Sequence, residues 1–381
     1  MRVLFSTTGG SGHFGPLLPF ARALVDSGHE VTVTAPASLA SVVVRAGFTC
    51  QPRTDIAPDA LGRFFAGMGD MSLEERNLLY IREVFGRLNL EYGLEDAKRI
   101  AAEWRPDLVV REAAEITSLA AANLLQIPQV QVSTGLASLD GVFFPQVAIA
   151  LAEAGLADAA ALVNALPRLT AVPPSFDVPA SQSGRIFRYR TEDGHQPSEP
   201  LPDWWPGKAD PLVYVTFGSE AGGMDLFPGF YRAVIDLLAR LRIRVLLTVG
   251  DRADPGRLGE LPANVHVEKF WPQSAAMPFA AAMVGHGGYG TTLTALAAGV
   301  PTVAIPLFAL DQHQNARRVN EVGAGIALAG GPADLGQLAQ ALESLLSEAS
   351  YAAAAGCIAA EIAALPPASE SVAVFEQVAS G

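Results

Sequence analysis

The chain has 381 residues, of which 50% are hydrophobic and 17% are charged, so it is long enough for two domains and too apolar to be disordered. Its net charge of −13 argues against a nucleic-acid partner, because phosphates call for a basic surface. The N-terminus lacks a basic region followed by an apolar signal core, and charges interrupt every long apolar stretch. These features predict a cytoplasmic protein with no membrane partner.

Short apolar runs alternate with helical patterns along the first part of the chain. Helical patterns are found, for example, at Leu17–Val25 and Ile116–Leu125. The apolar runs are short enough for buried parallel strands, and they are Val3–Phe5, Val31–Val33, Leu108–Val110 and Val130–Val132.

A stretch rich in proline and charge follows from Arg190 and includes TEDGHQPSEPLPDWWPGKADP, which predicts a linker. The alternation then restarts, with strands expected at Leu212–Phe217, Arg244–Val249, Val265–Val267, Met283–Val284 and Thr302–Ile305. The repeated pattern predicts an α/β fold of two doubly wound parallel-sheet domains that face each other across a cleft. Ligands are expected beyond the carboxyl ends of the strands.

The loop after the first strand contains GSGHFG at residues 10–15, which has the glycine spacing of a dinucleotide-binding turn. Such a site also needs an acidic residue at the end of the second strand, where this chain has Thr-Ala-Pro at residues 34–36. His13 and Phe14 occupy positions where a pyrophosphate requires close approach to the backbone. The loop therefore argues against NAD binding.

A second glycine turn, in MVGHGGYGTTLTALAAGVP from Met283 to Pro301, leads from a strand into a helix. Free N–H groups and the positive dipole end of a helix N-terminus form an anion site, and His286 can donate a further hydrogen bond to phosphate. The alternative interpretation is a tightly packed turn without a ligand.

The motifs around this turn form a recognisable set. F-W-P-Q begins at Phe270, HGG-x-G at His286, GVP-x-x-x-x-P at Gly299 and DQ-x-x-NA at Asp311. In this order they resemble the donor-binding signature of family-1 glycosyltransferases of the GT-B fold, in particular the bacterial enzymes that glycosylate antibiotics and other natural products. The resemblance covers nearly the whole chain.

The resemblance implies that the second domain binds a TDP- or UDP-sugar. The base would stack on Phe270, the aligned aromatic residue, or lie beside Trp271. Asp311 and Gln312 would contact sugar hydroxyls, although Asp311 also suits a helix N-cap. No D-x-D triplet occurs, and the resemblance likewise implies that no metal or other cofactor is needed. The remaining expected donor contacts are Gly218, Ser219, Gln273, His286, Gly287, Gly288 and Thr291.

The same resemblance gives the first glycine loop a different role. His13 matches the family's general base, which takes the proton of the acceptor hydroxyl; the alternative is a capping or packed histidine. An acidic partner is expected after the fourth strand, in the sequence REAAE. Glu112 is the aligned residue, Glu115 lies one turn later, and Arg111 beside Glu112 could neutralise it. Both carboxylates could also be ordinary loop or helix charges.

The acceptor pocket is expected in two stretches of the first domain that are rich in Phe, Met and Leu, which suits a hydrophobic aglycone such as a polyketide. Ordinary helix packing explains the same residues nearly as well. The expected acceptor contacts are Gly12, Phe14, Phe64, Phe65, Met68, Phe143 and Phe144.

The motifs and the resemblance that they carry imply an inverting glycosyltransferase. As its sugar donor we expect a TDP-deoxysugar rather than a UDP-sugar. Residues 1–200 would bind the acceptor, residues 201–365 the nucleotide sugar, and a C-terminal helix at 366–381 would return to the N-terminal domain. Two alternatives remain: a UDP-N-acetylglucosamine-using cell-wall-type transferase, and a catalytically inert GT-B-like protein that activates a partner enzyme. A homodimer is compatible with the sequence.

Overall fold

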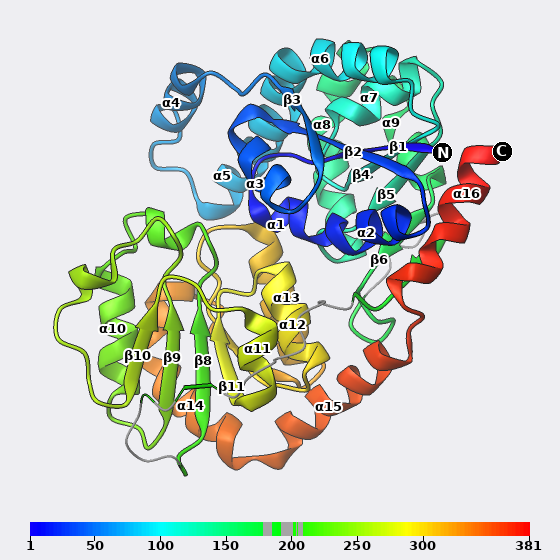
Figure 1. Cartoon of the computed structure of the whole chain (residues 1–381). Helices are drawn as coiled ribbons and strands as arrows, with labels where there is room; N and C mark the ends of the chain where they lie inside the picture. Colours follow the sequence, from blue (N-terminus) through cyan, green and yellow to red (C-terminus); the bar gives the residue numbers. More distant parts are fainter. Residues whose placement is uncertain (178–184, 192–200, 203, 205–208) are drawn as a thin grey trace. The chain divides into compact units, whose positions relative to one another are not determined.

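The computed structural model describes residues 1–177, 185–191, 201–202, 204 and 209–381. The chain divides into two compact units, shown in Figure 1. Unit 1 comprises Met1–Val172, Asp177–Glu192 and Leu365–Gly381, and unit 2 comprises Pro173–Phe176 and Asp193–Ala364. Most of the predicted linker, at 192–200, 203 and 205–208, lies outside the described residues.

Unit 1 contains a parallel sheet in the order β3-β2-β1-β4-β5-β6-β7. All four strands predicted from apolar runs in this part of the chain are present. The sheet also contains β3, where Pro52 interrupts the pattern, and the three-residue strands β6 and β7. The bounds are β1 (Arg2–Ser6), β2 (Glu30–Pro36), β3 (Thr49–Arg53), β4 (Leu108–Glu112), β5 (Gln129–Val132), β6 (Arg168–Thr170) and β7 (Ile186–Arg188).

Helices cover both faces of this sheet. Side chains alternate between the faces along each strand, and apolar side chains on both faces need a cover. Val3 and Phe5 pack with Phe20 of α2, whereas Leu4 packs with Ile100 of α6 and Ala122 of α7 on the other face. The helices of the first 172 residues are α1 (Ser11–Phe14), α2 (Leu18–Asp26), α3 (Ala40–Arg45), α4 (Pro58–Ala66), α5 (Leu73–Tyr80), α6 (Asn89–Trp104), α7 (Thr117–Leu124), α8 (Asp140–Glu153) and α9 (Ala159–Ala165).

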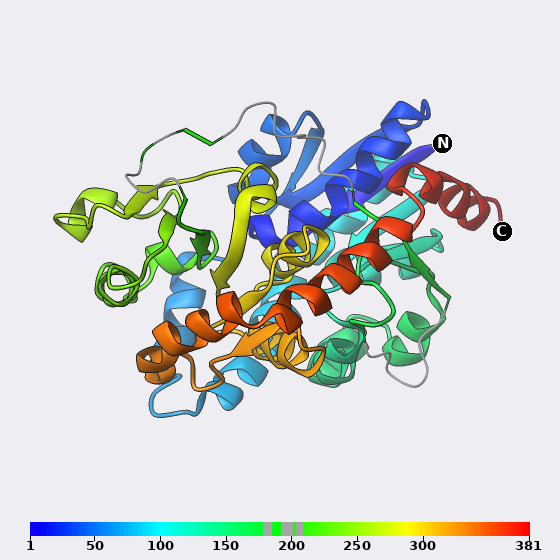
Figure 2. The ribbon, with the colours of Figure 1, turned by 90° about the horizontal axis from the view of Figure 1, so that it is seen from below.

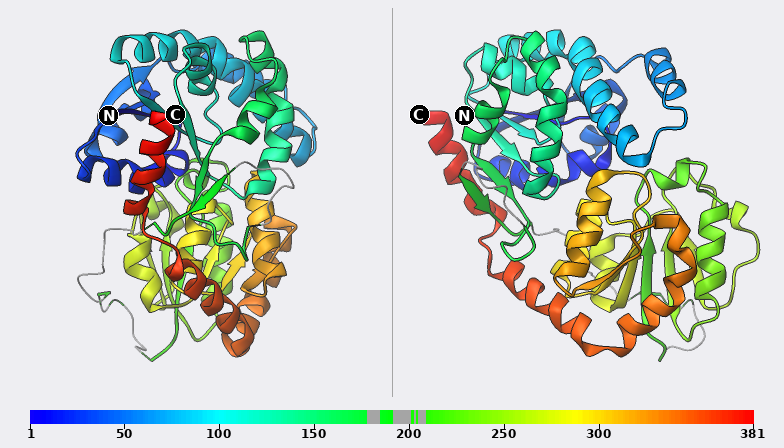
Figure 3. Two further views of the ribbon diagram at one scale, coloured as in Figure 1. Left: turned by 90° about the vertical axis from the view of Figure 1, so that its right-hand side faces the viewer. Right: turned by 180° about the vertical axis from the view of Figure 1, so that it is seen from behind.

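The C-terminal helix α16 (Val372–Ser380) packs within unit 1, against α2 (Figure 3). The ring of Phe375 is fully buried and lies 6.4 Å from that of Phe20, centroid to centroid. The preceding segment is held by Arg190, whose Nη1 donates to the carbonyl of Leu365 at 2.6 Å. The last residues of the chain therefore complete the core that the first residues begin.

Unit 2 contains a parallel sheet in the order β10-β9-β8-β11-β12-β13. All five strands predicted in this half are present; β13 was not predicted. The bounds are β8 (Leu212–Thr216), β9 (Arg244–Thr248), β10 (Val265–Glu268), β11 (Ala280–Gly285), β12 (Thr302–Ala304) and β13 (Gly325–Ala327). The helices are α10 (Gly229–Leu238), α11 (Gln273–Ala276), α12 (Tyr289–Ala297), α13 (Leu310–Glu321), α14 (Leu338–Ser347) and α15 (Ala349–Ala364).

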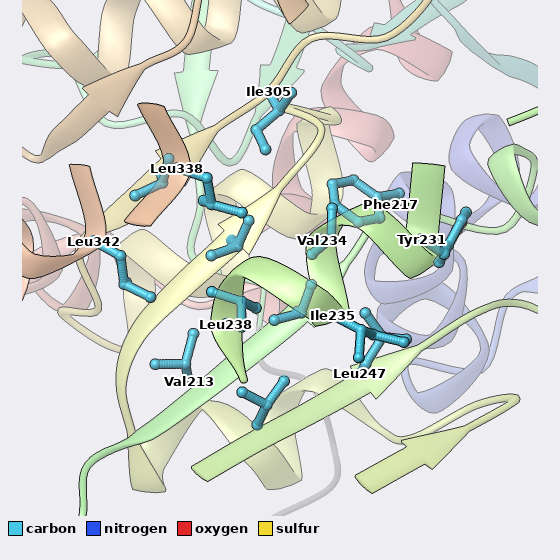
Figure 4. Packing of buried hydrophobic residues seen from close by; sticks show 14 of the residues in the cluster. Val213, Phe217, Tyr231, Val234, Ile235, Leu238, Leu247, Ile305, Leu338 and Leu342 are labelled. Atoms are coloured by element: carbon cyan, nitrogen blue, oxygen red, sulfur yellow. The ribbon is translucent and has the colours of Figure 1, made fainter. Parts of the chain in front are cut away.

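One face of this second sheet is covered by α10 and α14, as Figure 4 shows: Leu238 and Leu342 from these helices join Val213 and Leu247 in one apolar core. The other face is covered in part by α12, against which α15 packs (Figure 2). No helix in the described part of the chain is long and apolar enough to cross a membrane.

Candidate functional site

His13 lies in the loop that follows β1. The chain turns at Gly10, whose φ of +101° favours glycine, and α1 begins directly afterwards. The N–H groups of His13 and Phe14 both donate to the carbonyl of Gly10 at 3.3 Å. The imidazole is half-buried beyond the carboxyl end of β1, the edge of a parallel sheet at which ligands bind.

Glu112, the last residue of the neighbouring strand β4, lies beside this imidazole. Its Oε2 is 3.3 Å from Nδ1 of His13, and its side chain is fully buried. Oε1 accepts hydrogen bonds from the backbone N–H (3.2 Å) and the hydroxyl (2.8 Å) of Thr8, and Oε2 accepts one from the N–H of Ala114 at 2.6 Å.

The carboxylate of Glu112 is held in its ionised form. Burial acts to raise its pKa, but the nearby His13 and the hydrogen bonds from His13, Ala114 and Thr8 outweigh burial, so the pKa lies below its ordinary value. An ionised carboxylate can only accept hydrogen bonds. With Nδ1 of His13 facing this carboxylate at 3.3 Å, the neutral imidazole that has its proton on Nδ1 has its lone pair on Nε2.

Glu115, the other candidate partner of His13, is engaged elsewhere. Its carboxylate pairs with Arg53 at 2.5 Å and accepts hydrogen bonds from the N–H groups of Thr117 (3.1 Å) and Ser118 (2.9 Å) at the start of α7. Of the two carboxylates in REAAE, the structure places Glu112 at His13.

Arg111 lies beside Glu112, as expected. Its fully buried guanidinium donates to Oε1 of Gln131 at 2.8 Å and to the carbonyl of Glu112 at 3.3 Å. Burial lowers the pKa of Arg111 to about 10, against the opposing effect of the charges of Glu115 and Glu112, which act to raise it. Arg111 is therefore charged at neutral pH. Its hydrogen bonds thus go to Gln131 and to backbone carbonyls, rather than to the carboxylate of Glu112.

A row of aromatic side chains extends from His13. The ring of Phe85 lies 5.6 Å from that of His13, 5.4 Å from that of Tyr80 and 5.8 Å from that of Phe143, centroid to centroid. Further ring contacts connect the other members. We call this set the aromatic row; it consists of Phe64, Phe65, Tyr80, Phe85, Phe143 and Phe144.

Phe64 and Phe65 were predicted acceptor contacts and have exposed ring surface. Phe143 and Phe144 were also predicted, but both are buried, at 7% exposure, so their expected role as direct acceptor contacts is corrected: they pack against other rings of the row. Tyr80 and Phe85 were not singled out. Phe85 lies in a π-helical segment, Ile81–Leu88, whose wider turn hides it from a search for 3.6-residue periodicity.

Two other predicted acceptor contacts are not members of this row, although the N–H of Met68 donates to the carbonyl of Phe65 at 3.2 Å. Phe14 is 2% exposed and packs in the core of unit 1, so its expected role is corrected: the ring has no surface left for an acceptor. Met68 is half-buried in the turn that follows α4. Gly12 is exposed within α1, with no atom within 4 Å of the position where a Cβ would lie, so the backbone beside His13 remains accessible.

The second glycine turn lies between β11 and α12. Gly287 has a φ of +78°, and a Cβ there would lie 2.6 Å from the carbonyl oxygen of Gln312, so this position requires glycine. Nδ2 of Asn315 donates to the carbonyl of Gly287 at 2.8 Å. The next residue, Gly288, is the N-cap of α12 and makes no side-chain cap hydrogen bond; the start of such a helix favours an anion.

His286 is buried between two glycines. A Cβ would lie 2.9 Å from its Nε2 at Gly218 and 2.4 Å from it at Gly288, so both positions must lack a side chain for the imidazole to fit. Burial lowers the pKa of His286 to about 4, against the opposing effect of a hydrogen bond with the backbone of Thr216. The imidazole is therefore neutral at pH 7.

The buried neutral His286 should make folding stability depend on pH. The unfolded chain takes up this proton near pH ~6.5, whereas the folded protein takes it up near pH 4. The free energy of unfolding should thus fall by about 2 kcal/mol from pH ~7.5 to pH ~5 because of this residue alone. Urea unfolding of the wild type and of His286→Asn at both pH values measures it. Equal losses in the two proteins would contradict the assignment.

The two candidate base-stacking residues differ in exposure. Phe270 is 70% exposed. Trp271 packs edge-on against Trp204 at 4.9 Å, and Trp204 stacks on His266 at 3.9 Å. The structure thus leaves Phe270 as the accessible ring, whereas Trp271 is half-buried against the core of unit 2.

The two polar residues expected at the donor sugar, Gln312 and Asp311, differ in exposure. Gln312 is 4% exposed, and its Oε1 accepts from the backbone N–H groups of Leu307 (2.9 Å) and Phe308 (3.1 Å), so this oxygen supports the loop before α13. Asp311 is half-buried in the first turn of α13, and Ala309, not Asp311, is the N-cap.

The remaining expected donor contacts lie near the glycine turn. Nε2 of Gln273 donates to the hydroxyl of Thr291 at 3.1 Å, and Gly218 and Ser219 follow the carboxyl end of β8. Among the described residues, no three His, Cys, Asp or Glu side chains are grouped so that they could hold a metal ion.

The chain is similar to known proteins over its whole length. Residues 232–378 match the family described as "Erythromycin biosynthesis protein CIII-like, C-terminal domain". The elloramycin glycosyltransferase ElmGT of Streptomyces olivaceus is 30% identical over 96% of this chain and 94% of its own. The aclacinomycin-T 2-deoxy-L-fucose transferase of Streptomyces galilaeus is 26% identical over 99% and 96%.

Solved structures show the same fold. The glycosyltransferase VinC, crystallised in complex with dTDP, superposes with a TM-score of 0.79 at 26% identity and full coverage of both chains. These similarities agree with the two parallel Rossmann-like sheets and with the motif set. The chain therefore belongs to the family-1 glycosyltransferases of the GT-B fold, among the bacterial enzymes of antibiotic and natural-product biosynthesis, and it is a sugar-transferring enzyme.

Proposed function

We propose that this enzyme transfers a deoxysugar from TDP to a hydrophobic natural-product aglycone, with inversion at the anomeric carbon. Support for the donor comes from relatives: one is named a 2-deoxy-L-fucose transferase, and VinC was crystallised with dTDP. Support for the mechanism comes from the 3.3 Å contact between Nδ1 of His13 and Glu112, which is the observation that carries the proposal.

The reaction is a single in-line displacement. The acceptor oxygen forms a bond to the anomeric carbon while the bond from that carbon to the diphosphate oxygen breaks, and TDP leaves with the electron pair. The acceptor proton passes to Nε2 of His13. The buried Glu112 then faces an imidazolium, whose charge it balances.

The diphosphate is proposed to bind at the N-terminus of α12. The N–H groups of the first turn and the positive end of the helix dipole favour an anion. We propose that His286, beside Gly218 and Gly288, takes up a proton as the anion binds, because only the imidazolium has a second N–H for the diphosphate besides the one held by the backbone of Thr216. Phe270 offers an exposed ring to the base. These groups would stabilise the negative charge that develops on the leaving diphosphate. We propose that no metal or other cofactor takes part.

The acceptor is proposed to lie along the aromatic row, which begins at the ring next to His13. Phe65 is 53% exposed and Phe64, Tyr80 and Phe85 are half-buried, so the row offers apolar surface that a large hydrophobic aglycone can cover. This placement brings the aglycone and the proton-accepting nitrogen together.

Free TDP should stabilise the protein in the presence of EDTA. At about 100 times its dissociation constant the nucleotide should raise the free energy of unfolding by ~2.7 kcal/mol. Thermal melting with TDP, with UDP and without nucleotide measures the effect, and TDP should give the larger shift at equal concentration. The absence of a shift with either nucleotide at millimolar concentration would overturn the proposed donor site.

A further inference from the structure

A buried ion pair in unit 1 is connected, through Thr7 and Thr8, to the contact between His13 and Glu112. Nη1 of Arg53, at the end of β3, is 2.5 Å from Oε1 of Glu115, and the two side chains are 4% and 1% exposed. A buried ion pair is by itself weak evidence for a contribution to stability, because the desolvation of both charges offsets their attraction. Its other contacts indicate what it does.

Arg53 also holds the backbone that follows β1. Nη2 of Arg53 donates to the carbonyl of Thr7 at 2.8 Å. The backbone N–H of Thr7 donates in turn to the carbonyl of Thr34 on β2 at 3.2 Å. Both backbone groups of Thr7, its N–H and its carbonyl, are thus hydrogen-bonded. A guanidinium can bond a carboxylate and a carbonyl at once because its donors form a rigid fork.

The next residue, Thr8, makes the connection to the catalytic pair. Its N–H and hydroxyl donate to Oε1 of Glu112 at 3.2 and 2.8 Å, while Oε2 of the same carboxylate faces Nδ1 of His13 at 3.3 Å. Thr8 therefore fixes Oε1 while the N–H of Ala114 fixes Oε2 at 2.6 Å, and the two together set the rotation of the carboxylate that faces the imidazole.

We propose that Arg53 and Glu115 are positioning residues for catalysis, acting through Thr7, Thr8 and Glu112 on the orientation of His13. Glu115 fixes one side of the guanidinium at the start of α7, and the guanidinium fixes the loop that presents Thr8. The proposal rests on the assignment of His13 as the general base.

The test uses a variant in which no charge is left buried without a partner. Arg53→Met combined with Glu115→Gln removes both charges together, whereas Arg53→Met alone would leave a lone buried carboxylate and risk unfolding. Thr8→Val removes the hydroxyl bond to Glu112 with little change in shape. The matched control combines Arg168→Met with Asp140→Asn, which removes another ion pair in unit 1.

Turnover is measured with TDP-glucose and two acceptors, 4-methoxyphenol and the more acidic 4-nitrophenol. The Arg53/Glu115 double variant should lose about ten- to a hundredfold in kcat with 4-methoxyphenol. The loss should be smaller with 4-nitrophenol, which needs less help to lose its proton. KM for both acceptors and Kd for TDP should stay unchanged. Thr8→Val should show the same selectivity, and the control pair should not.

Nitrogen NMR of the histidine rings gives a second measurement, which does not depend on either phenol being accepted. The signals of His13 are identified by their loss in His13→Ala. In the wild type they should show the proton on Nδ1, and in the Arg53/Glu115 variant a mixture of the two neutral tautomers.

Two results would overturn the proposal: unchanged tautomer signals for His13 in the double variant, or equal losses with both phenols. A wrong assignment of His13 as the general base gives a different result from a wrong role for Arg53 and Glu115. In the first case His13→Ala would keep full turnover, whatever the Arg53/Glu115 variant does.

Discussion

Replacement of His13 by alanine should lower turnover by about a hundred- to ten-thousandfold while the affinity for TDP stays nearly unchanged. The physical reason is that Nε2 of His13 is proposed to take the acceptor proton, whereas the proposed nucleotide site consists of residues of unit 2. Product chromatography and calorimetric titration of TDP measure the two quantities. A more acidic acceptor, such as a nitrophenol, should recover part of the lost rate, since its hydroxyl gives up the proton more readily.

His286→Ala is the matched comparison, because it removes the other imidazole of the proposed site. It should weaken TDP binding as well as turnover, since His286 is proposed to donate to the diphosphate. Full turnover of His13→Ala on a phenolic or alcoholic acceptor at neutral pH would place the base elsewhere and refute the proposed mechanism.

Gly287→Ala should both destabilise the protein and weaken nucleotide binding. Alanine at a φ of +78° is strained, and its Cβ would lie 2.6 Å from the backbone oxygen of Gln312, which cannot move aside as a flexible side chain would. We expect a loss of about 2 to 4 kcal/mol in the free energy of unfolding. Displacement of the amides at the start of α12 should weaken TDP binding roughly ten- to a hundredfold.

Gly290→Ala is the control for the effect of Gly287→Ala on stability. It lies within α12, and a Cβ there would meet no atom within 4 Å, so alanine should leave the free energy of unfolding unchanged or raise it by about 0.5 to 1 kcal/mol. Urea unfolding and calorimetric titration of TDP measure both variants. Wild-type stability and TDP affinity in Gly287→Ala would show that the turn tolerates rearrangement and does not form the diphosphate site.

The sequence predicted His13 and Glu112 as candidates because residue type and position in the α/β pattern are both visible in it. It could not choose between Glu112 and Glu115, because that choice depends on side-chain direction: Glu112 ends β4 and faces Thr8, whereas Glu115 lies at the start of α7 and faces Arg53. The role of Arg53 was invisible for the same reason, since β3 is far from both carboxylates in the sequence.

The aromatic residues show a second limit. Phe14 and Phe85 are the same residue type near the same histidine, yet Phe14 packs in the core and Phe85 contacts the imidazole. The difference arises from the short α1 and from the π-helical segment Ile81–Leu88, neither of which has a periodic sequence signal. The three-residue strand β12 was predicted because it lies in the apolar run Thr302–Ile305, whereas β6 and β7, also with three residues each, have no such run around them.

The packing of α16 in unit 1 has a consequence for the synthesis of the protein. Phe375, Val374 and Ala368 complete a core whose buried residues otherwise come from the first 189 residues. The ribosome adds them only after the whole of unit 2, through Ala364, has been made. Domains usually fold in the order in which they are synthesised. Here unit 2 has all of its residues first, and the nascent unit 1 keeps the apolar surface around Phe20 uncovered until α16 has been synthesised.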